Sequence, residues 1–292
     1  MTVINTNTAA TLTANALTKN ERAMSQAMER LSTGVRINSA SDDAAGLAIS
    51  SRMTSQVNGL NMAVRNGNDA ISMLQTADGA LVEVSNMLQR LREITVQASS
   101  GTNGATDITA LKTEFDALVA GIEDVADDTQ WNGANILNAA STKTFQVGAN
   151  ASQTIDYAFK NLQSGAGAGS ILGDLDIDGD GSVGDSATAI GALNISTNSA
   201  SRIEALNGIS GAIDSVNAER AGIGATINRL EYAVDNLANV SQNTSASRSR
   251  ILDADYASET TELARTQIIQ QAGTAMLSQA NQQAQSVLAL LK

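Results

Sequence analysis

Near the N-terminus, apolar residues recur every three, four or seven positions, which is the spacing of one face of an α-helix. The series predicts a first helix from about Thr11 to Val35. Gly34 interrupts the pattern, and residues 38–41 are expected to form a loop. The apolar positions of this series are Leu17, Met24, Met28, Leu31 and Val35.

A second and longer apolar series predicts a helix that ends at about Ala98. Ser41 is expected to be its N-cap, with Asp42 and Asp43 in the first turn, where carboxylates favour the positive end of the helix dipole. At 1.5 Å per residue such a helix is roughly 80 Å long, which is typical of a coiled-coil arm. Its apolar face comprises Met53, Val57, Leu60, Val64, Ile71, Leu74, Leu81, Leu88 and Leu91.

A third series alternates steps of three and four residues without a fault, which is the seam pattern of a left-handed coiled coil. Thr106 and Asp107 are expected to cap this helix, and Asn132-Gly133 ends the region. The seam positions are Ile108, Leu111, Phe115, Leu118, Ile122 and Val125.

From residue 142 the apolar period changes from helical to alternating, which is the pattern of β-strands with one buried face. Two alternating runs flank a polar stretch over residues 148–152, and together they predict a β-hairpin with a longer turn. The alternating positions are Phe145 and Val147 in the first run and Ile155, Tyr157 and Phe159 in the second.

The second half of the chain begins with a change of composition. Residues 164–191 are rich in Gly and Asp and are expected to form a short exposed insertion. Helical spacing returns over residues 206–237, pauses over a Ser/Asn/Arg stretch at 241–250, and resumes from about 253 to 291. We therefore predict a mainly α fold of long antiparallel coiled-coil helices, with a small β-hairpin region and paired N- and C-terminal helices.

Composition narrows the function classes. The 292 residues include no Pro, Cys or His, so disulfides, thiolate chemistry and His-based metal or catalytic sites are excluded. Enzymes that use only carboxylates or Lys are not excluded by this composition. The formal net charge of −12 disfavours nucleic acid and anionic membranes as partners. The N-terminus has neither the basic start nor the apolar run of a cleaved signal peptide.

Three segments resemble a known family. Residues 29–50, ERLSTGVRINSASDDAAGLAIS, look like the N-terminal signature of bacterial flagellins, and residues 85–97, SNMLQRLREITVQ, resemble a second flagellin block. Residues 251–292, which contain LDADYASETTELARTQIIQQAG and end in VLALLK, resemble the C-terminal block. The resemblance covers about the first 160 and the last 95 residues, in the same order as in the family.

The resemblance implies a division into domains. Residues 1–43 and 252–292 would form the terminal helical domain of the filament's inner tube. Residues 44–163 and 192–251 would form the helical outer-tube domain with the β-hairpin, and residues 164–191 the short surface insertion. Terminal helices with apolar stripes but weak internal cores are expected to become ordered only on assembly, which couples their folding to polymerisation.

The resemblance also implies the partners and the location. The main partner is the chain itself, as a helical homopolymer that forms the extracellular filament for swimming motility. Export would use the flagellum's own type III channel, without a cleaved signal peptide. A flagellar export chaperone would hold the C-terminal helix, and cap and hook-junction proteins would be met during assembly.

One segment resembles the part of flagellins that the flagellin-sensing Toll-like receptor recognises. The receptor would be a host partner, and packing within the filament would be the native role of the same residues. Ile94 stands where the family usually has Leu. The residues are Leu88, Gln89, Arg90, Arg92, Glu93, Val96 and Gln97, with Glu114 on the next helix.

The acidic insertion is a candidate Ca²⁺ site, because its Asp spacing resembles an EF-hand loop. One register starts at Asp174 and places Asp at the twelfth position, where Glu is usual. The other starts at Asp176 and ends on Ala187, which is no ligand. A solvated acidic loop is the alternative. The candidate ligands are Asp174, Asp176, Asp178, Asp180 and Asp185.

These observations predict a structural filament subunit without enzymatic activity and with no cofactor other than this candidate Ca²⁺. A hook–filament junction protein shares the helical termini and is one alternative. A calcium-dependent surface adhesin on a helical stalk is another. An enzyme is disfavoured because the insertion is too short for a catalytic domain and lacks His and Cys.

Overall fold

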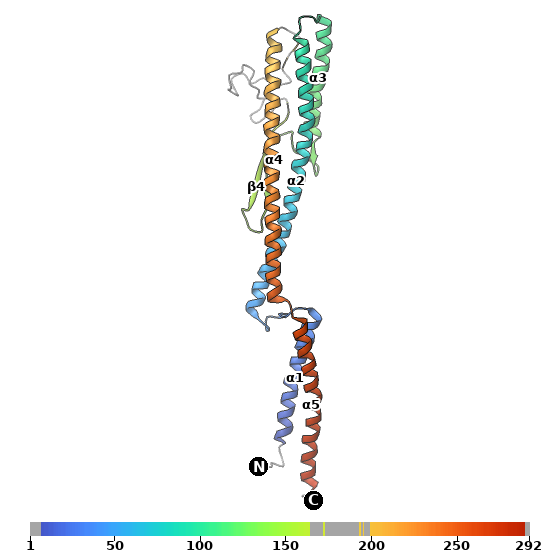
Figure 1. Cartoon of the computed structure of the whole chain (residues 1–292), viewed down its shortest axis with the longest axis vertical. Coiled ribbons are helices and arrows are strands. Elements are labelled where there is room, and N and C mark those ends of the chain that lie inside the picture. The colour runs from blue at the N-terminus through green and yellow to red at the C-terminus, as the bar shows by residue number, and fades with distance from the viewer. Residues whose placement is uncertain (1–6, 164–171, 173–192, 194, 196–198, 290–292) are drawn as a thin grey trace. The chain divides into compact units, whose positions relative to one another are not determined.

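The computed structural model describes residues 7–163, 172, 193, 195 and 199–289. The described residues form five α-helices and two small antiparallel hairpins (Figure 1). They group into two compact units, which we call the terminal unit (residues 1–57 and 241–292) and the central unit (residues 58–240). The helices are α1 (Thr8–Thr33), α2 (Ala44–Ala98), α3 (Ala105–Asp128), α4 (Ser199–Leu252) and α5 (Tyr256–Ala289).

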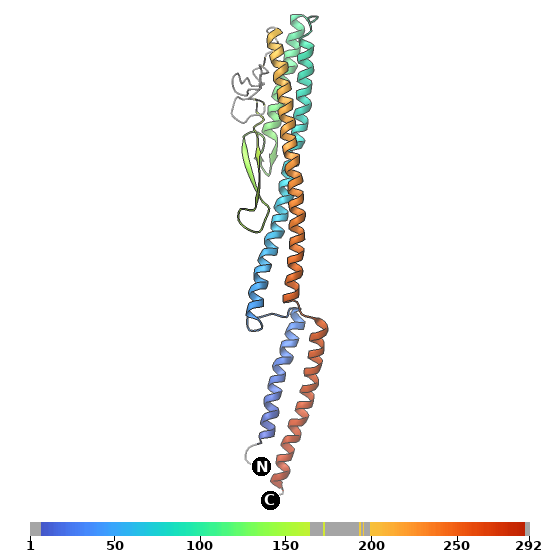
Figure 2. The same ribbon diagram turned by 60° about the vertical axis from the view of Figure 1, so that its left-hand side comes forward.

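In the terminal unit, α1 and α5 lie side by side in antiparallel orientation, as both views show (Figures 1 and 2). The pairing of N- and C-terminal helices predicted from the sequence is confirmed. Near one end of the pair, Asn7 Nδ2 donates to the Ala280 carbonyl oxygen at 3.1 Å. Near the other end, Arg30 Nη1 lies 3.1 Å from Glu259 Oε1.

Specific caps set the ends of these helices. α1 begins three residues before the predicted start, because the Asn7 side chain accepts a hydrogen bond from the Ala10 amide at 3.0 Å. It ends at Gly34, whose φ of 70° lies in the left-handed region that favours glycine. The prediction that Ser41 caps α2 was wrong: Asp43 accepts from the Gly46 amide at 2.9 Å.

The loop after α1 is joined to the segment between α4 and α5. Val35 and Asp253 form an antiparallel β-bridge. The Arg36 amide donates to the Leu252 carbonyl oxygen at 2.6 Å, and the Ala254 amide donates to the Gly34 carbonyl oxygen at 3.0 Å. These bonds fix the point from which α1 and α5 run together.

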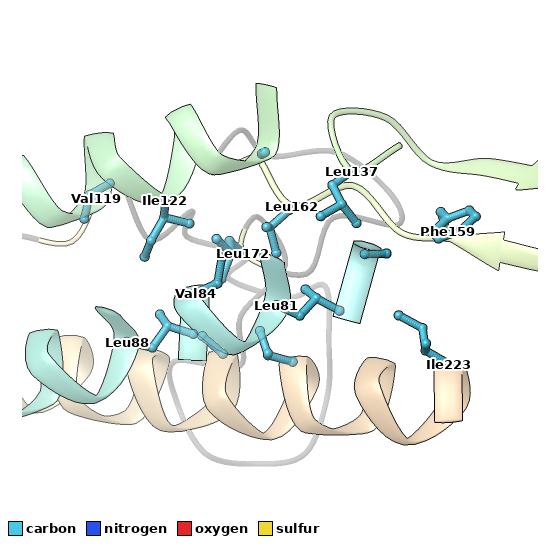
Figure 3. Close-up of a cluster of buried hydrophobic side chains, with 14 of the residues drawn as sticks. Leu81, Val84, Leu88, Val119, Ile122, Leu137, Phe159, Leu162, Leu172 and Ile223 are labelled. Carbon is cyan, nitrogen blue, oxygen red and sulfur yellow. The ribbon is translucent and has the colours of Figure 1, made fainter. Parts of the chain in front are cut away.

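The central unit has a continuous apolar core between α2, α3 and α4. Leu81 and Leu88 of α2 and Ile122 of α3 have no exposed surface. Figure 3 shows side chains from all three helices gathered with Phe159 and with the segments after the hairpins. Leu172, which belongs to the segment predicted to be an exposed insertion, is also fully buried there.

Close backbone approach brings α2 against α4. A Cβ added to Gly67 would lie 2.5 Å from Val234 Cγ2, so only glycine fits at this crossing. Arg220, the one polar interruption in the apolar series of α4, donates to Asp78 of α2 at 2.9 Å. The polar residue therefore lies at the edge of the helix contact and pairs with a charge across it.

The predicted pause over residues 241–250 was wrong, because α4 continues as a helix to Leu252. Ser, Asn and Thr disfavour a helix interior by well under about 1 kcal/mol each, and the stretch contains neither Gly nor Pro. Tertiary contacts outweigh this preference: Ser241 is buried, and Arg248 Nη1 donates to Thr54 Oγ1 of α2 at 3.3 Å.

The predicted β-hairpin is confirmed as β3 (Ser141–Gln146) paired with β4 (Thr154–Phe159). Phe145 lies opposite Ile155 in the register, and the buried positions of β4 alternate as predicted. A second, smaller hairpin was missed. It pairs β1 (Gln130–Trp131) with β2 (Ala134–Asn135) across Asn132-Gly133, both with positive φ.

Candidate assembly and recognition surfaces

The α1–α5 pair buries very little apolar surface. Among its described residues, only Asn20 and Ala27 of α1 and Thr266 of α5 are buried. Large apolar side chains of the same helices are exposed instead, and such surfaces in soluble proteins mark interaction sites. They include Leu12 at 73%, Met28, Tyr256, Ile268 at 66% and Met276.

Polar contacts hold the pair together. Asn20 Nδ2 donates to the Thr266 carbonyl oxygen at 2.7 Å and to Gln270 Oε1 at 3.3 Å. Gln270 Nε2 in turn donates to Glu21 Oε1 at 3.2 Å. The only large side-chain packing given by glycine occurs at Gly273, where an added Cβ would lie 3.0 Å from Leu17 Cδ1. The pair is thus specified in register but lacks a core of its own.

Charge is divided unevenly between the two units. The sequence of the terminal unit contains nine Lys or Arg and eight Asp or Glu, a net charge of +1. The central unit contains nine Lys or Arg and 22 Asp or Glu, a net charge of −13. Copies of the nearly neutral terminal unit can therefore approach one another without strong repulsion, whereas the central units repel.

The receptor-like residues of α2 lie mostly on the surface of the central unit. Gln89, Arg90, Arg92, Glu93, Val96 and Gln97 are exposed, and so is Glu114 of α3. Leu88 is the exception: it has no exposed surface and belongs to the core. Ile94 is also fully buried, so the Ile that replaces Leu here affects packing and not the exposed surface.

Arg90 ties this surface together. Its guanidinium donates to Glu114 Oε1 at 2.7 and 2.9 Å and to Glu93 Oε2 at 2.9 Å. Hydrogen bonds from Arg90 to Glu114 and then to Glu93 raise the pKa of the Arg90 guanidinium. A groove of about 780 Å³ lies beside it, between α2 and α4, and its walls include Arg92, Val96 and Ile213.

The structure also contains a buried polar contact that the sequence did not reveal. Glu219 of α4 is only 5% exposed, and its Oε1 accepts a hydrogen bond from the Tyr157 hydroxyl at 2.6 Å. Burial, followed by the contact with Glu219, raises the pKa of Tyr157. Lys160 Nζ lies 3.8 Å from Glu219 Oε2 and offsets its charge. The contact fastens β4 to α4.

The candidate Ca²⁺ ligands Asp174, Asp176, Asp178, Asp180 and Asp185 lie outside the described residues. Within the part of the chain that the structure describes, no group of three or more acidic side chains is arranged to hold a metal ion. No helix in that part is long and apolar enough to cross a membrane.

Comparison with known proteins agrees with these surfaces. The family model described as the bacterial flagellin N-terminal helical region matches residues 4–142, and that of the C-terminal helical region matches residues 206–291. The chain is 41% identical to a flagellin of Bacillus subtilis over 307 positions, covering 99% of each chain. It is 44% identical to a flagellin of Halalkalibacterium halodurans, covering 91% of each.

A solved structure shares the fold. It is a Vibrio parahaemolyticus protein assigned to the flagellar hook-associated proteins, with a TM-score of 0.59 and 15% identity, covering 73% of this chain and all of that one. At this identity the likeness concerns the fold alone, and the two flagellin relatives determine the family. Flagellins are structural proteins of the extracellular flagellar filament and not enzymes. The chain belongs to the bacterial flagellin family and is a structural subunit that polymerises into the flagellar filament.

Proposed function

We propose that the two units divide the work of the filament subunit. Residues 1–43 and 252–292 form the inner-tube domain, which carries polymerisation. Residues 44–163 and 192–251 form the outer-tube domain, and residues 164–191 the surface insertion. The observation that supports this division is the coreless α1–α5 pair, which exposes Leu12, Ile268 and Met276 although it is specified in register.

Such a pair gains little from folding alone. Most helical stability in proteins comes from packing an apolar face, and α1 and α5 bury almost none in one copy. Contacts with neighbouring copies would cover the exposed side chains and order both helices. Contacts between two different surfaces of the same chain that do not close into a ring produce an open helical polymer.

Deletion of residues 254–292 tests this assignment. The truncated chain is expected to remain monomeric when mixed with filament seeds, while its central unit keeps its helical circular dichroism. Sedimentation and electron microscopy would measure assembly. Filaments from the truncated chain would overturn the assignment.

Point variants sharpen the same test without removing α5. The double variant Ile268→Ser/Met276→Ser removes two exposed apolar side chains and is expected to raise the critical concentration for seeded growth. Thr260→Ser, at an exposed position of the same helix, is the matched control and should assemble as the wild-type chain does. Equal critical concentrations for all three chains would contradict the proposal.

We further propose that the exposed part of the receptor-like segment is recognised by the flagellin-sensing Toll-like receptor. The support is the continuous exposed surface of Gln89, Arg90, Glu93 and Glu114, which ion pairs hold in one arrangement. Leu88 would act from beneath, as core packing. Arg90→Ala is expected to reduce receptor activation by the monomer, whereas Lys112→Ala on α3 should not. Equal activity of Arg90→Ala and wild type would remove this role.

The remaining partners follow from the exposed apolar side chains of α5. We propose that an export chaperone covers this helix before export through the type III channel, without a cleaved signal peptide. Filament cap and hook-junction proteins would then meet the subunit during assembly. Calorimetric titration of the chain with the flagellar export chaperone should show binding that the 254–292 deletion abolishes; unchanged binding would contradict it.

A Ca²⁺ site in the acidic insertion is the last proposal. Its support is the spacing of Asp174, Asp176, Asp178 and Asp180, which provides oxygen ligands at alternate positions. Titration calorimetry with CaCl₂ is expected to show saturable binding that Asp178→Ala weakens. Equal heats for the two chains would exclude the site.

A further inference from the structure

Arg30 of α1 has a donor that its own chain does not satisfy. Its Nη1 lies 3.1 Å from Glu259 Oε1 of α5, and its side chain is 26% exposed. Its Nε is buried and has no hydrogen-bond partner among the described residues. A buried donor without an acceptor is costly and rare, so the position calls for an acceptor from outside the chain.

The space beside Arg30 can admit one. A groove of about 490 Å³ runs between α1 and α5 in the terminal unit. Ala23 and Ala27 of α1 and Ser258 of α5 line it with small side chains, which let another helix approach closely.

The charges around the groove select the kind of acceptor. Glu259 already neutralises Arg30, and Glu262 lies on the same lining, where it pairs with Arg265. A visiting carboxylate would meet two carboxylates and be repelled. A neutral acceptor, such as an amide oxygen, meets no such repulsion and satisfies the Nε donor.

The same chain presents such acceptors on another surface. Residues 266–289 contain no Asp, Glu, Lys or Arg. Along the described side chains of this stretch, α5 exposes a row of amides, which we call the amide row: Gln267, Gln271, Gln279, Asn281 and Gln282. The groove and the amide row are different surfaces of one chain, which is what a polymer that does not close requires.

We propose that the Arg30 groove of one subunit accepts an amide oxygen from the amide row of a neighbouring subunit in the filament. This contact rests on the proposed role of α1 and α5 in polymerisation and names the two surfaces that meet. The neutrality of the terminal unit permits the approach, and the acceptor completes the hydrogen bonding of Arg30.

The test is seeded growth of full-length chains, with the critical concentration as the measured quantity. Arg30→Lys keeps the cation beside Glu259 but removes the Nε donor, and it is expected to raise the critical concentration about tenfold. Arg265→Lys, which changes an exposed Arg on the other helix, is the matched control and should match wild type. A role confined to the Arg30–Glu259 ion pair would leave Arg30→Lys unchanged, and that result would overturn the proposal.

A non-additivity test identifies the partner surface. The variant Gln267→Ala/Gln271→Ala/Gln279→Ala removes three amides of the row and is also expected to raise the critical concentration. If both changes break one contact, combining them with Arg30→Lys should cost no more than the larger single effect. Multiplied effects would show separate contacts and overturn the pairing. Filaments from the 254–292 deletion would instead overturn the polymerisation role of α5 itself.

Discussion

The two units differ in where their stability comes from. The central unit buries large side chains such as Leu74, Leu81 and Phe115 completely within one copy. The terminal unit has the longer exposed apolar stripe and buries almost nothing between α1 and α5. Both are built from long helices with similar periodicity in the sequence. Periodicity therefore indicates which face will be covered, but not whether the cover comes from the same chain or from another copy.

Their charges differ in the same sense. The terminal unit is nearly neutral and the central unit has a net charge of −13. A neutral surface can be packed tightly against its own copies, while an acidic one stays hydrated and keeps assemblies soluble. The difference assigns close packing to the terminal unit and the solvent-facing role to the central unit.

The largest expected effect tests this contrast by truncating one Leu in each unit. Leu81→Ala removes a fully buried side chain and is expected to lower the free energy of unfolding of the monomer by about 2–5 kcal/mol. Leu12→Ala, at a side chain 73% exposed, should change it by less than about 0.5 kcal/mol. Urea unfolding followed by circular dichroism would measure both, and equal losses would break the comparison.

A smaller effect is expected at the buried polar contact of the central unit. Tyr157→Phe leaves Glu219 buried without its hydroxyl donor and should cost about 1–3 kcal/mol in unfolding free energy. Tyr232→Phe, at a side chain 79% exposed, is the control and should be neutral. Adding Glu219→Met to Tyr157→Phe should recover part of the loss, since no carboxylate is then left unpaired. A neutral Tyr157→Phe would show that the contact does not fasten the hairpin.

How far the sequence predicts this molecule depends on the distance over which each signal acts. The seam of α3 and the alternation of β4 were predicted correctly because each reflects one face of one element. Asn132-Gly133 carried a strong hairpin signal, but the strands beside it are only two residues long and show no alternation. The local signals at 241–250 pointed to a break, and contacts with α2 overrode them.

Contacts between distant segments could not be predicted in the same way. Glu219 looks like any surface Glu in a helix, and only the position of β4 makes it a buried acceptor. Arg30 and Glu259 are separated by 229 positions, and nothing in either local pattern selects the other. The exposed receptor-like residues were found by resemblance, whereas the burial of Leu88 emerges only from the packed core.

A still smaller effect is expected from an exposed ion pair in the central unit. Lys112 Nζ lies 2.6 Å from Asp116 Oδ1, one turn along α3. Lys112→Ala should lower the unfolding free energy by only about 0.3–0.5 kcal/mol, and less at high salt. Urea unfolding at two salt concentrations would measure it. A loss above about 1 kcal/mol would show that surface charges contribute more to this unit than the contrast with its core allows.

The smallest effect concerns the loop of the terminal unit and depends on pH. Asp42 Oδ2 accepts from the Ser39 amide at 2.9 Å and from the Asn38 amide at 3.2 Å, and these bonds lower the pKa of Asp42 from 3.8. A lowered pKa stabilises the folded loop above the unfolded value, and this contribution is lost as the pH falls below about 3.8 through the folded pKa.

Hydrogen exchange of the Asn38 and Ser39 amides, compared with Asp42→Asn, would measure this contribution. Wild type should be better protected at pH 5–7, and the two chains should converge in acid. Since the chain has no His, no step near pH 6.5 is expected in either. Convergence above pH 5 would mean that another group orders the loop. Convergence only in acid would show that the terminal unit, which lacks a core, relies on a single carboxylate to shape the start of α2.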